Sequence, residues 1–295
     1  MPAGNFVPPP LVVCVGETLW DVLPHGEYLG GAPLNVAAHL SRLGVDTRLV
    51  SRVGADRRGR EALERIAALG LDTRLVERDA DLPTGTAEAS VDASGSASYR
   101  FPAPAAWDAL EAGDAAVAAA TGNTVVFGTL GQRSGASASA IERLVAAARW
   151  TVFDANLRPP HDARDIALRS LARARFVKLN DDEVRVFAGW LGADPTPEAL
   201  WRRLSAEFGT PSLCVTEGAR GARLWHAGDY VEQPAHPATI VDTIGAGDSF
   251  LAMLLAELLR GSSARTAMVR AARLAAYVVS QRGATPDYEP ASFIG

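Results

Sequence analysis

Short apolar runs alternate with amphipathic stretches along most of the chain. The run at residues 11–16 is continuous and rich in β-branched side chains, which is typical of a strand buried on both faces of a parallel sheet. Similar runs predict further strands at residues 48–53, 124–128, 150–154, 176–179 and 213–216. Helical patterns separate them, so the sequence predicts an α/β fold: a doubly wound, mostly parallel sheet flanked by helices.

Glycine and proline residues mark the ends of several expected helices. Pro33 suits the first turn of one helix and Gly44 its end, and Gly70 ends the helix expected at residues 60–69. Other helices are expected at residues 136–149 and 164–174, after Asp181, after Thr196 and at residues 248–259.

Residues 84–101 are polar where a core strand would be apolar. Residues 86–92 and 96–101 flank a turn, which predicts a hairpin that would not bury well in a sheet core. We expect a small β-sheet lid over a site, formed together with residues near 17–30. The predicted layout is a single α/β domain over residues 1–295, with the lid inserted at about 17–32 and 84–106.

Composition narrows the class of protein. The 295 residues are 48% hydrophobic, which allows a large core and excludes fibrous and disordered classes. The 29 basic and 34 acidic residues give a net charge of -5, without a basic face for nucleic acid or anionic lipid. Small-molecule chemistry is therefore favoured.

The cysteines, the N-terminal residues and the longest apolar helix all bear on the compartment in which the protein is expected. Cys14 and Cys214 lie in apolar runs, as buried free thiols in a reducing compartment do. Residues 1–10 lack a signal-peptide pattern, and the apolar helix at 250–259 is too short to span a bilayer and contains Glu257. We therefore expect a cytoplasmic protein without nucleic-acid or membrane partners.

The stretch from Gly245 to Asp248 combines an anion site with an acid. Gly245, Ala246 and Gly247 leave backbone N–H groups unshielded, and a helix follows them. Asp248 in its first turn lies at the positive end of the helix dipole. A carboxylate there does not help simple anion binding, but it suits phosphoryl transfer if it takes a proton from an attacking hydroxyl. The alternatives are a tight turn capped by Asp248 and a damaged dinucleotide fingerprint with Phe250 in place of its third glycine.

Polar residues follow several of the predicted strands. Ligands of an open α/β sheet bind beyond the carboxyl ends of its strands, so these residues are candidates for a site. They are Glu17, Asp21 and residues 154–158, 180–183 and 216–221. Their ordinary alternatives are a helix cap at Asn180, a hairpin turn at 216–221, a surface role for Arg158 and a solvated loop acid at Asp21.

Four motifs occur together in a fixed order. They are Gly30-Gly31-Ala32-Pro33-Leu34-Asn35, Gly54-x-Asp56-x-x-Gly59, Asn180-x-x-Glu183 and Asp242-Thr243-x-Gly245-Ala246-Gly247-Asp248. With them the chain resembles the ribokinase-like (PfkB-type) carbohydrate kinases over essentially its whole length, and within that family the bacterial fructokinases. Kinases of 2-keto-3-deoxygluconate share much of the same pattern.

The resemblance implies a role for each motif. Asp248 would be the general base for the primary hydroxyl of the sugar, and the amides of Gly245, Ala246 and Gly247 would stabilise the transferring phosphoryl group. The sugar contacts would be Asp21, Gly30, Gly31, Asn35 and Arg158.

The same resemblance implies ATP, Mg²⁺ and K⁺ sites. Asn180 and Glu183 would position Mg²⁺ through water, and Asp242 begins a loop that in many relatives binds K⁺. The ATP site would include Lys178, which is the only lysine of the chain, with Asn180, Thr216, Gly218 and Gly221. An alanine-rich helix with Ala271, Ala272, Ala275 and Ala276 would form the wall of the adenine site.

The expected function is an ATP-dependent sugar kinase that phosphorylates the primary hydroxyl of a ketohexose, with D-fructose to fructose 6-phosphate as the first candidate. Alternatives are a 2-keto-3-deoxygluconate kinase, with Arg100 or Arg133 for the substrate carboxylate, another sugar or nucleoside kinase of the family, and a catalytically silent sugar-binding regulator. A nicotinamide-dependent oxidoreductase lacks its fingerprint after the first strand. The lid would exclude water, and its exposed strands would pair two subunits into a homodimer.

Overall fold

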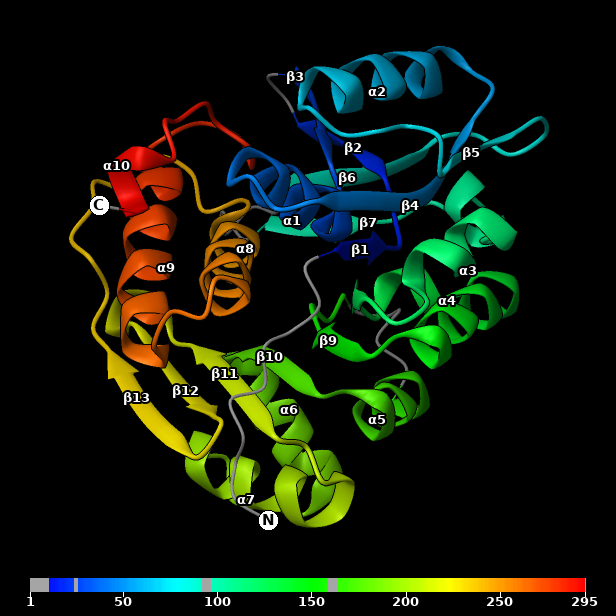
Figure 1. Cartoon of the computed structure of the whole chain (residues 1–295). Helices are drawn as coiled ribbons and strands as arrows, with labels where there is room; N and C mark the ends of the chain where they lie inside the picture. The colour runs from blue at the N-terminus through cyan, green and yellow to red at the C-terminus, as the bar shows by residue number, and fades with distance from the viewer. Residues whose placement is uncertain (1–10, 24–25, 92–96, 159–163, 295) are drawn as a thin grey trace.

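The computed structural model describes residues 11–23, 26–91, 97–158 and 164–294 (Figure 1). The strands of the larger sheet are β1 (Val12–Val15), β4 (Thr47–Gly54), β5 (Val76–Asp79), β8 (Thr124–Phe127), β9 (Trp150–Asp154), β10 (Phe176–Asn180), β11 (Ser212–Thr216), β12 (Ala222–His226) and β13 (Asp229–Gln233). Their order across the sheet is β13-β12-β11-β10-β9-β8-β1-β4-β5. Neighbours from β11 to β5 run parallel, and β12 and β13 form an antiparallel edge. The predicted doubly wound, mostly parallel sheet is confirmed.

Helices cover both faces of this sheet. They are α1 (Ala32–Arg42), α2 (Arg57–Ala68), α3 (Asp114–Ala120), α4 (Gly135–Ala147), α5 (Arg164–Arg173), α6 (Asp181–Leu191), α7 (Pro197–Phe208), α8 (Ala246–Leu259), α9 (Ala264–Val279) and the short α10 (Ala291–Ile294). Figure 1 shows α3 to α7 on one side and α1, α8 and α9 on the other.

The alternation of side chains along each strand divides the core into two layers. Val12 and Cys14 belong to the buried cluster under α1, α8 and α9, whereas Val13 and Val15 belong to the cluster under α3 to α7. Successive side chains of a strand point to opposite faces, so a strand covered on both sides must be apolar throughout. Cys14 and Cys214 are buried and free, as expected.

A second sheet stands apart from the first and has the order β3-β2-β6-β7. Its strands are β2 (Leu19–Leu23), β3 (Gly26–Gly30), β6 (Gly85–Val91) and β7 (Ala97–Arg100). The antiparallel pair β6–β7 is the predicted polar hairpin, and the turn expected at 93–95 lies outside the described residues. Parallel pairing of β2 with β6 joins two segments that are distant in the sequence. The small separate sheet is therefore present, as predicted.

Several elements differ from the sequence-based expectation, among them β5 and α3, which the sequence pattern did not predict. Helix α2 begins at Arg57 and not at residue 60, because the Asp56 carboxylate accepts the N–H of Gly59 at 2.7 Å and caps the first turn. The antiparallel pair β12–β13 was not predicted. Its strands carry charged residues among apolar ones, and buried Leu224 lies between the half-buried Arg223 and Trp225. A half-exposed edge strand gives a weaker apolar signal than a central one.

Candidate active site

A cavity of about 1060 Å³ opens beyond the carboxyl ends of the parallel strands. It brings together most of the residues that the motifs predicted. Those lining it are Asp21, Gly31, Asn35, Arg158, Lys178, Asn180, Thr216, Gly218, Gly221, Gly245, Ala246, Gly247 and Asp248. Gly30, Glu183 and Asp242 do not line it.

The first turn of α8 forms one end of this cavity. Gly245 precedes the helix with φ at 77°, and a Cβ on Gly245 would lie 2.6 Å from Cα of Ala284. Glycine is therefore required there both by the backbone conformation and by the close approach of a second segment. The first N–H groups of a helix have no intrahelical partner, so this turn can bind an anion.

Asp248 is buried in this turn and is paired with a residue of α1. Nδ2 of Asn35 donates to Oδ2 of Asp248 at 2.8 Å. Burial, together with the negative charge of Asp154, raises the pKa of Asp248 to about 6, although the Asn35 hydrogen bond and the charges of Lys178 and Arg158 oppose this. The sequence assigned Asn35 to the sugar and gave no signal that it contacts Asp248.

Acidic groups gather on the side of the cavity that is predicted to hold the sugar, the predicted sugar side. Burial raises the pKa of Asp21 to about 6 and that of Glu17 to about 7, despite the opposing charge of Arg158. Oε1 of Glu17 accepts the N–H of Ala32 at 3.3 Å at the start of α1. Glu17 lines the cavity and is a site candidate that the motifs missed, although its position after the first strand pointed to it.

The two glycines before α1 leave room for these acids. A Cβ on Gly30 would lie 2.5 Å from Oδ2 of Asp21, and one on Gly31 would lie 2.4 Å from the carbonyl oxygen of Glu17. Gly31 also has φ at 119°, which favours glycine. Gly30 therefore leaves space for Asp21 and does not itself line the cavity, and its contact with the sugar stays a prediction.

The smaller sheet supplies apolar side chains to the same cavity. Leu19 of β2, Ala87 of β6 and Phe101 line it beside Leu130. The predicted sugar side thus has a polar wall of carboxylates with Arg158, covered by apolar side chains.

The part of the cavity that is predicted to hold the nucleotide lies along the loop after β11 and the helix α9. Gly218 and Gly221 line it with positive φ of 56° and 108°, in the turn that connects β11 to β12. The hairpin-turn alternative for 216–221 is therefore also correct. Ala272, Ala275 and Ala276 line the cavity, whereas Ala271 is fully buried behind it and does not belong to the wall.

Asn180 and Glu183 form a capping box at the start of α6. Oδ1 of Asn180 accepts the N–H of Glu183, and Oε2 of Glu183 accepts the N–H of Asn180, both at 2.8 Å. Oε1 of Glu183 accepts the N–H of Leu157 at 2.7 Å, and burial raises the pKa of Glu183. The helix-cap alternative is thus observed, and Glu183 lies behind the cavity wall.

The oxygen donors near α6 nevertheless fit a hydrated Mg²⁺. Asn180, Asp181 and Asp182 line the cavity, and no cluster of three or more metal-ligating side chains occurs in the described residues. Mg²⁺ keeps several waters and is usually held by one or two carboxylates and the phosphates of a nucleotide, so such a cluster is not needed.

Asp242 connects two segments instead of facing the cavity. Its Oδ1 accepts the N–H of Ile244 at 3.0 Å, and its Oδ2 accepts the N–H of Gly283 at 3.1 Å. The carboxylate therefore orders the loop before α8 against the segment after α9.

Two arginines considered for a substrate carboxylate are engaged elsewhere. Arg133 is buried, forms a two-point ion pair with Asp108 at 2.7 Å and lies over the ring of Trp107. Arg100 is exposed and pairs with Glu88. Neither lines the cavity, so the structure gives no support to this role for them.

Comparisons with known proteins identify the family of the chain. The family model described as pfkB family carbohydrate kinase matches residues 12–291. A fructokinase of Klebsiella pneumoniae is 32% identical over 258 residues, covering 83% of each chain. A fructokinase of Rhizobium leguminosarum bv. trifolii is 30% identical, covering 84% of this chain and 79% of the relative. The solved structure of fructokinase with bound ATP from Xylella fastidiosa has a TM-score of 0.84 at 25% identity, covering 96% of this chain and 98% of the other. Among the described residues, no helix is long and apolar enough to cross a membrane.

Proposed function

The chain belongs to the pfkB family of carbohydrate kinases, and from this premise we propose that it transfers the terminal phosphoryl group of ATP to the primary hydroxyl of a ketohexose, D-fructose first. The observation that carries this proposal is the pairing of Asp248 with Asn35 beside the amides of the first turn of α8. The fructokinase relatives support fructose as the sugar.

The reaction needs one proton transfer and one phosphoryl transfer. The oxygen of the sugar hydroxyl attacks the terminal phosphorus, its proton passes to the carboxylate of Asp248, and the bond to the bridging oxygen breaks to release ADP. The N–H groups of Gly245, Ala246 and Gly247 stabilise the charge on the transferring group. Asn35 orients Asp248 and favours its ionised form.

We propose that Asn180, Asp181 and Asp182 hold Mg²⁺ through its waters and the ATP phosphates. Bound there, the ion neutralises charge on the phosphates. Glu183 positions Asn180 through the capping box and does not touch the ion.

Three further points belong to the proposal. The smaller sheet acts as a lid inserted in a single domain, with Leu19, Ala87 and Phe101 excluding water from the sugar.

The loop that Asp242 orders is the site for K⁺. Replacing K⁺ by Na⁺ in an activity assay tests this site. Edge strands β3 and β7 are available for pairing between two copies, and sedimentation tests the resulting homodimer.

A second candidate substrate is 2-keto-3-deoxygluconate, because Arg158 is a cation in the wall of the sugar side. Arg158→Met separates the two candidates. It would raise KM for an acidic sugar by about a hundredfold, as loss of a charged hydrogen bond does, and would raise KM for fructose much less.

The test of the function measures ADP release with fructose, 2-keto-3-deoxygluconate, ribose, tagatose 6-phosphate and adenosine. With the sugar that turns over, Asp248→Asn should lower kcat by about a thousandfold, within the range for loss of a general base, and leave sugar binding largely unchanged. Activity of the variant within tenfold of wild type would overturn the assignment of Asp248. A wild-type protein that binds sugar but turns over none would be a silent regulator.

A further inference from the structure

A buried ion pair lies directly behind the anion site. Asp154 ends β9, and Lys178 lies beside it in register on β10. Nζ of Lys178 is 2.9 Å from Oδ1 of Asp154, and the two side chains are only 7% and 6% exposed. Such a pair rarely improves stability over apolar residues, because both charges lose their hydration. Stability alone therefore does not explain why the two charges are buried together.

The lysine head group lies against the first turn of α8. A Cβ on Gly247 would lie 3.1 Å from Nζ of Lys178 and 3.6 Å from its Cε. No side chain therefore separates the ammonium group from the turn that holds the anion site, and Lys178 also lines the large cavity. Lysine has a flexible stem, so its charge stays in one place only if something anchors it.

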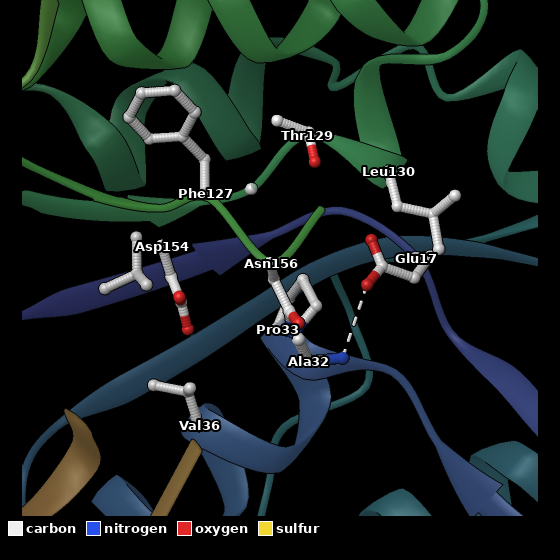
Figure 2. A pocket seen from close by; sticks show the side chains of 11 residues that line it. Glu17, Ala32, Pro33, Val36, Phe127, Thr129, Leu130, Asp154 and Asn156 are labelled. Atoms are coloured by element: carbon white, nitrogen blue, oxygen red, sulfur yellow. Dashed lines mark hydrogen bonds between the residues drawn. The ribbon is translucent and has the colours of Figure 1, made fainter. Parts of the chain in front are cut away.

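Asp154 holds Lys178 through only one of its two carboxylate oxygens, Oδ1. Its Oδ2 has no hydrogen-bond partner in the described residues. Figure 2 shows a second, small cavity that Asp154 shares with Glu17 and Asn156. Its volume of about 10 Å³ is near the space that one water molecule needs.

We propose that Asp154 is a positioning residue that acts through Lys178: it fixes the ammonium group beside Gly247, where the phosphates of the nucleotide bind. For its effect on turnover this inference rests on the proposed kinase function. For its effect on anion binding it rests only on the Asp154–Lys178 ion pair and on the close approach of Lys178 to Gly247. Asp154 itself does not line the large cavity, so it acts only through Lys178 and through its charge.

Asp154 also acts on the proposed base through space. Asp248 is faced by Asp154 and Lys178 from β9 and β10, by Arg158 after β9, and by Glu17 and Asp21 from the segment after β1. Removing the negative charge of Asp154 removes a contribution that raises the pKa of Asp248.

The first test compares Asp154→Asn with wild type by calorimetric titration of AMP and of a non-hydrolysable ATP analogue with Mg²⁺. Affinity for the ATP analogue should fall by about tenfold, at the lower end for a charged hydrogen bond, because the ammonium group of Lys178 is still present but no longer held in place. Affinity for AMP should change little. With a sugar that turns over, the acidic limb of kcat/KM should move to lower pH. If Asp154 had only a structural role, Asp154→Asn would change neither the ratio of the affinities for the ATP analogue and AMP nor the position of the acidic limb of kcat/KM.

A mutant cycle tests whether Asp154 acts through Lys178. Lys178→Met should lower ATP affinity at least as much as Asp154→Asn, and the double variant should be no worse than Lys178→Met. Additive losses would overturn the proposal. If Asp154→Asn does not fold, the double variant removes both charges and is compared with Lys178→Met. If no sugar turns over, the proposed function fails, and the nucleotide titrations still decide the role of Asp154.

Glu257→Gln is the matched control. Glu257 is fully buried on α8 and pairs with Arg260 and Arg270 at the end of the helix distant from Asp248. This variant should lower thermal stability and leave both the ATP-to-AMP ratio and the pH limb as in wild type. A shift in either one would mean that loss of any buried charge pair produces the effect, which would overturn the specific role of Asp154.

Discussion

Asp248 is a buried carboxyl group whose protonation depends on neighbours from other elements. Asn35 donates to it from α1, and Asp154 and Lys178 act on it from the central sheet. The pKa of about 6 places the change from the acid to the base form just below neutral pH. A general base works best with a pKa near the operating pH, so this environment suits the proposed role.

This pKa predicts the pH dependence of the reaction. Only the ionised form of Asp248 accepts the proton, so kcat/KM should fall as pH drops through about 6. Asn35→Ala removes a hydrogen bond that lowers the pKa, so its acidic limb should lie at higher pH than that of wild type. The measurement is kcat/KM for the preferred sugar across pH. An unmoved or downward-shifted limb in Asn35→Ala would contradict the assignment, and this shift is opposite to the one expected for Asp154→Asn.

The start of α6 combines a structural cap with a place in the cavity wall. Asn180 caps this helix, as Thr196 caps the neighbouring α7 by accepting the N–H of Ala199 at 3.2 Å. The two caps thus have the same local function, and only Asn180 lines the cavity.

These caps form a matched pair of variants. Asn180→Ala and Thr196→Ala should each lower the free energy of unfolding by about 1 kcal/mol, because each leaves an N–H group of the first turn without its partner. Only Asn180→Ala should also raise the Mg²⁺ concentration needed for half-maximal activity. Denaturant unfolding and a Mg²⁺ titration measure the two effects. Equal Mg²⁺ requirements in both variants would mean that Asn180 serves only as a helix cap.

At the scale of the whole molecule, His39 of α1 holds the C-terminal segment against the site. Its Nε2 lies 2.9 Å from the carbonyl oxygen of Ala284, and its Nδ1 lies 2.9 Å from the hydroxyl of Tyr288. Ala284 is also the residue that packs against Gly245. Burial lowers the pKa of His39 to about 4 from the ordinary 6.5, so the folded protein holds this ring neutral.

The depressed pKa of His39 predicts acid-sensitive folding. The unfolded chain binds the proton first, so the contribution of His39 is complete above about pH 6.5 and is lost as pH falls toward about 4, up to about 3 kcal/mol. Raised pKa values of Glu17, Asp21 and Asp248 act in the opposite direction over part of this range. The difference between wild type and His39→Gln isolates the histidine. That difference should shrink as pH falls, and a difference independent of pH would contradict the prediction.

Much of the fold and part of the site follow from local sequence. Continuous apolar runs identify the central parallel strands and a period of 3.6 identifies most helices, because the strands are buried on both faces and the helices on one. The link from Gly245 to Asp248 is also local: glycines, helix start and acid are consecutive, so the sequence alone predicts an anion site with an acid beside it. The amphipathic edge strands β12 and β13 gave no comparable signal.

Only the tertiary structure decided which distant residues meet. Asn35 donates a hydrogen bond to Asp248, which is 213 positions away in the sequence. Lys178 pairs with Asp154 because β9 and β10 are neighbouring strands, and Arg133 forms an ion pair with Asp108. The sequence determined the α/β class and the residue types available for phosphoryl transfer, since both depend on short-range periodicity and backbone chemistry. Which side chain contacts Asp248, which one pairs with Lys178 and which arginine lines the cavity depend on strand order and burial, and these become defined only when the sheet and its helices pack together.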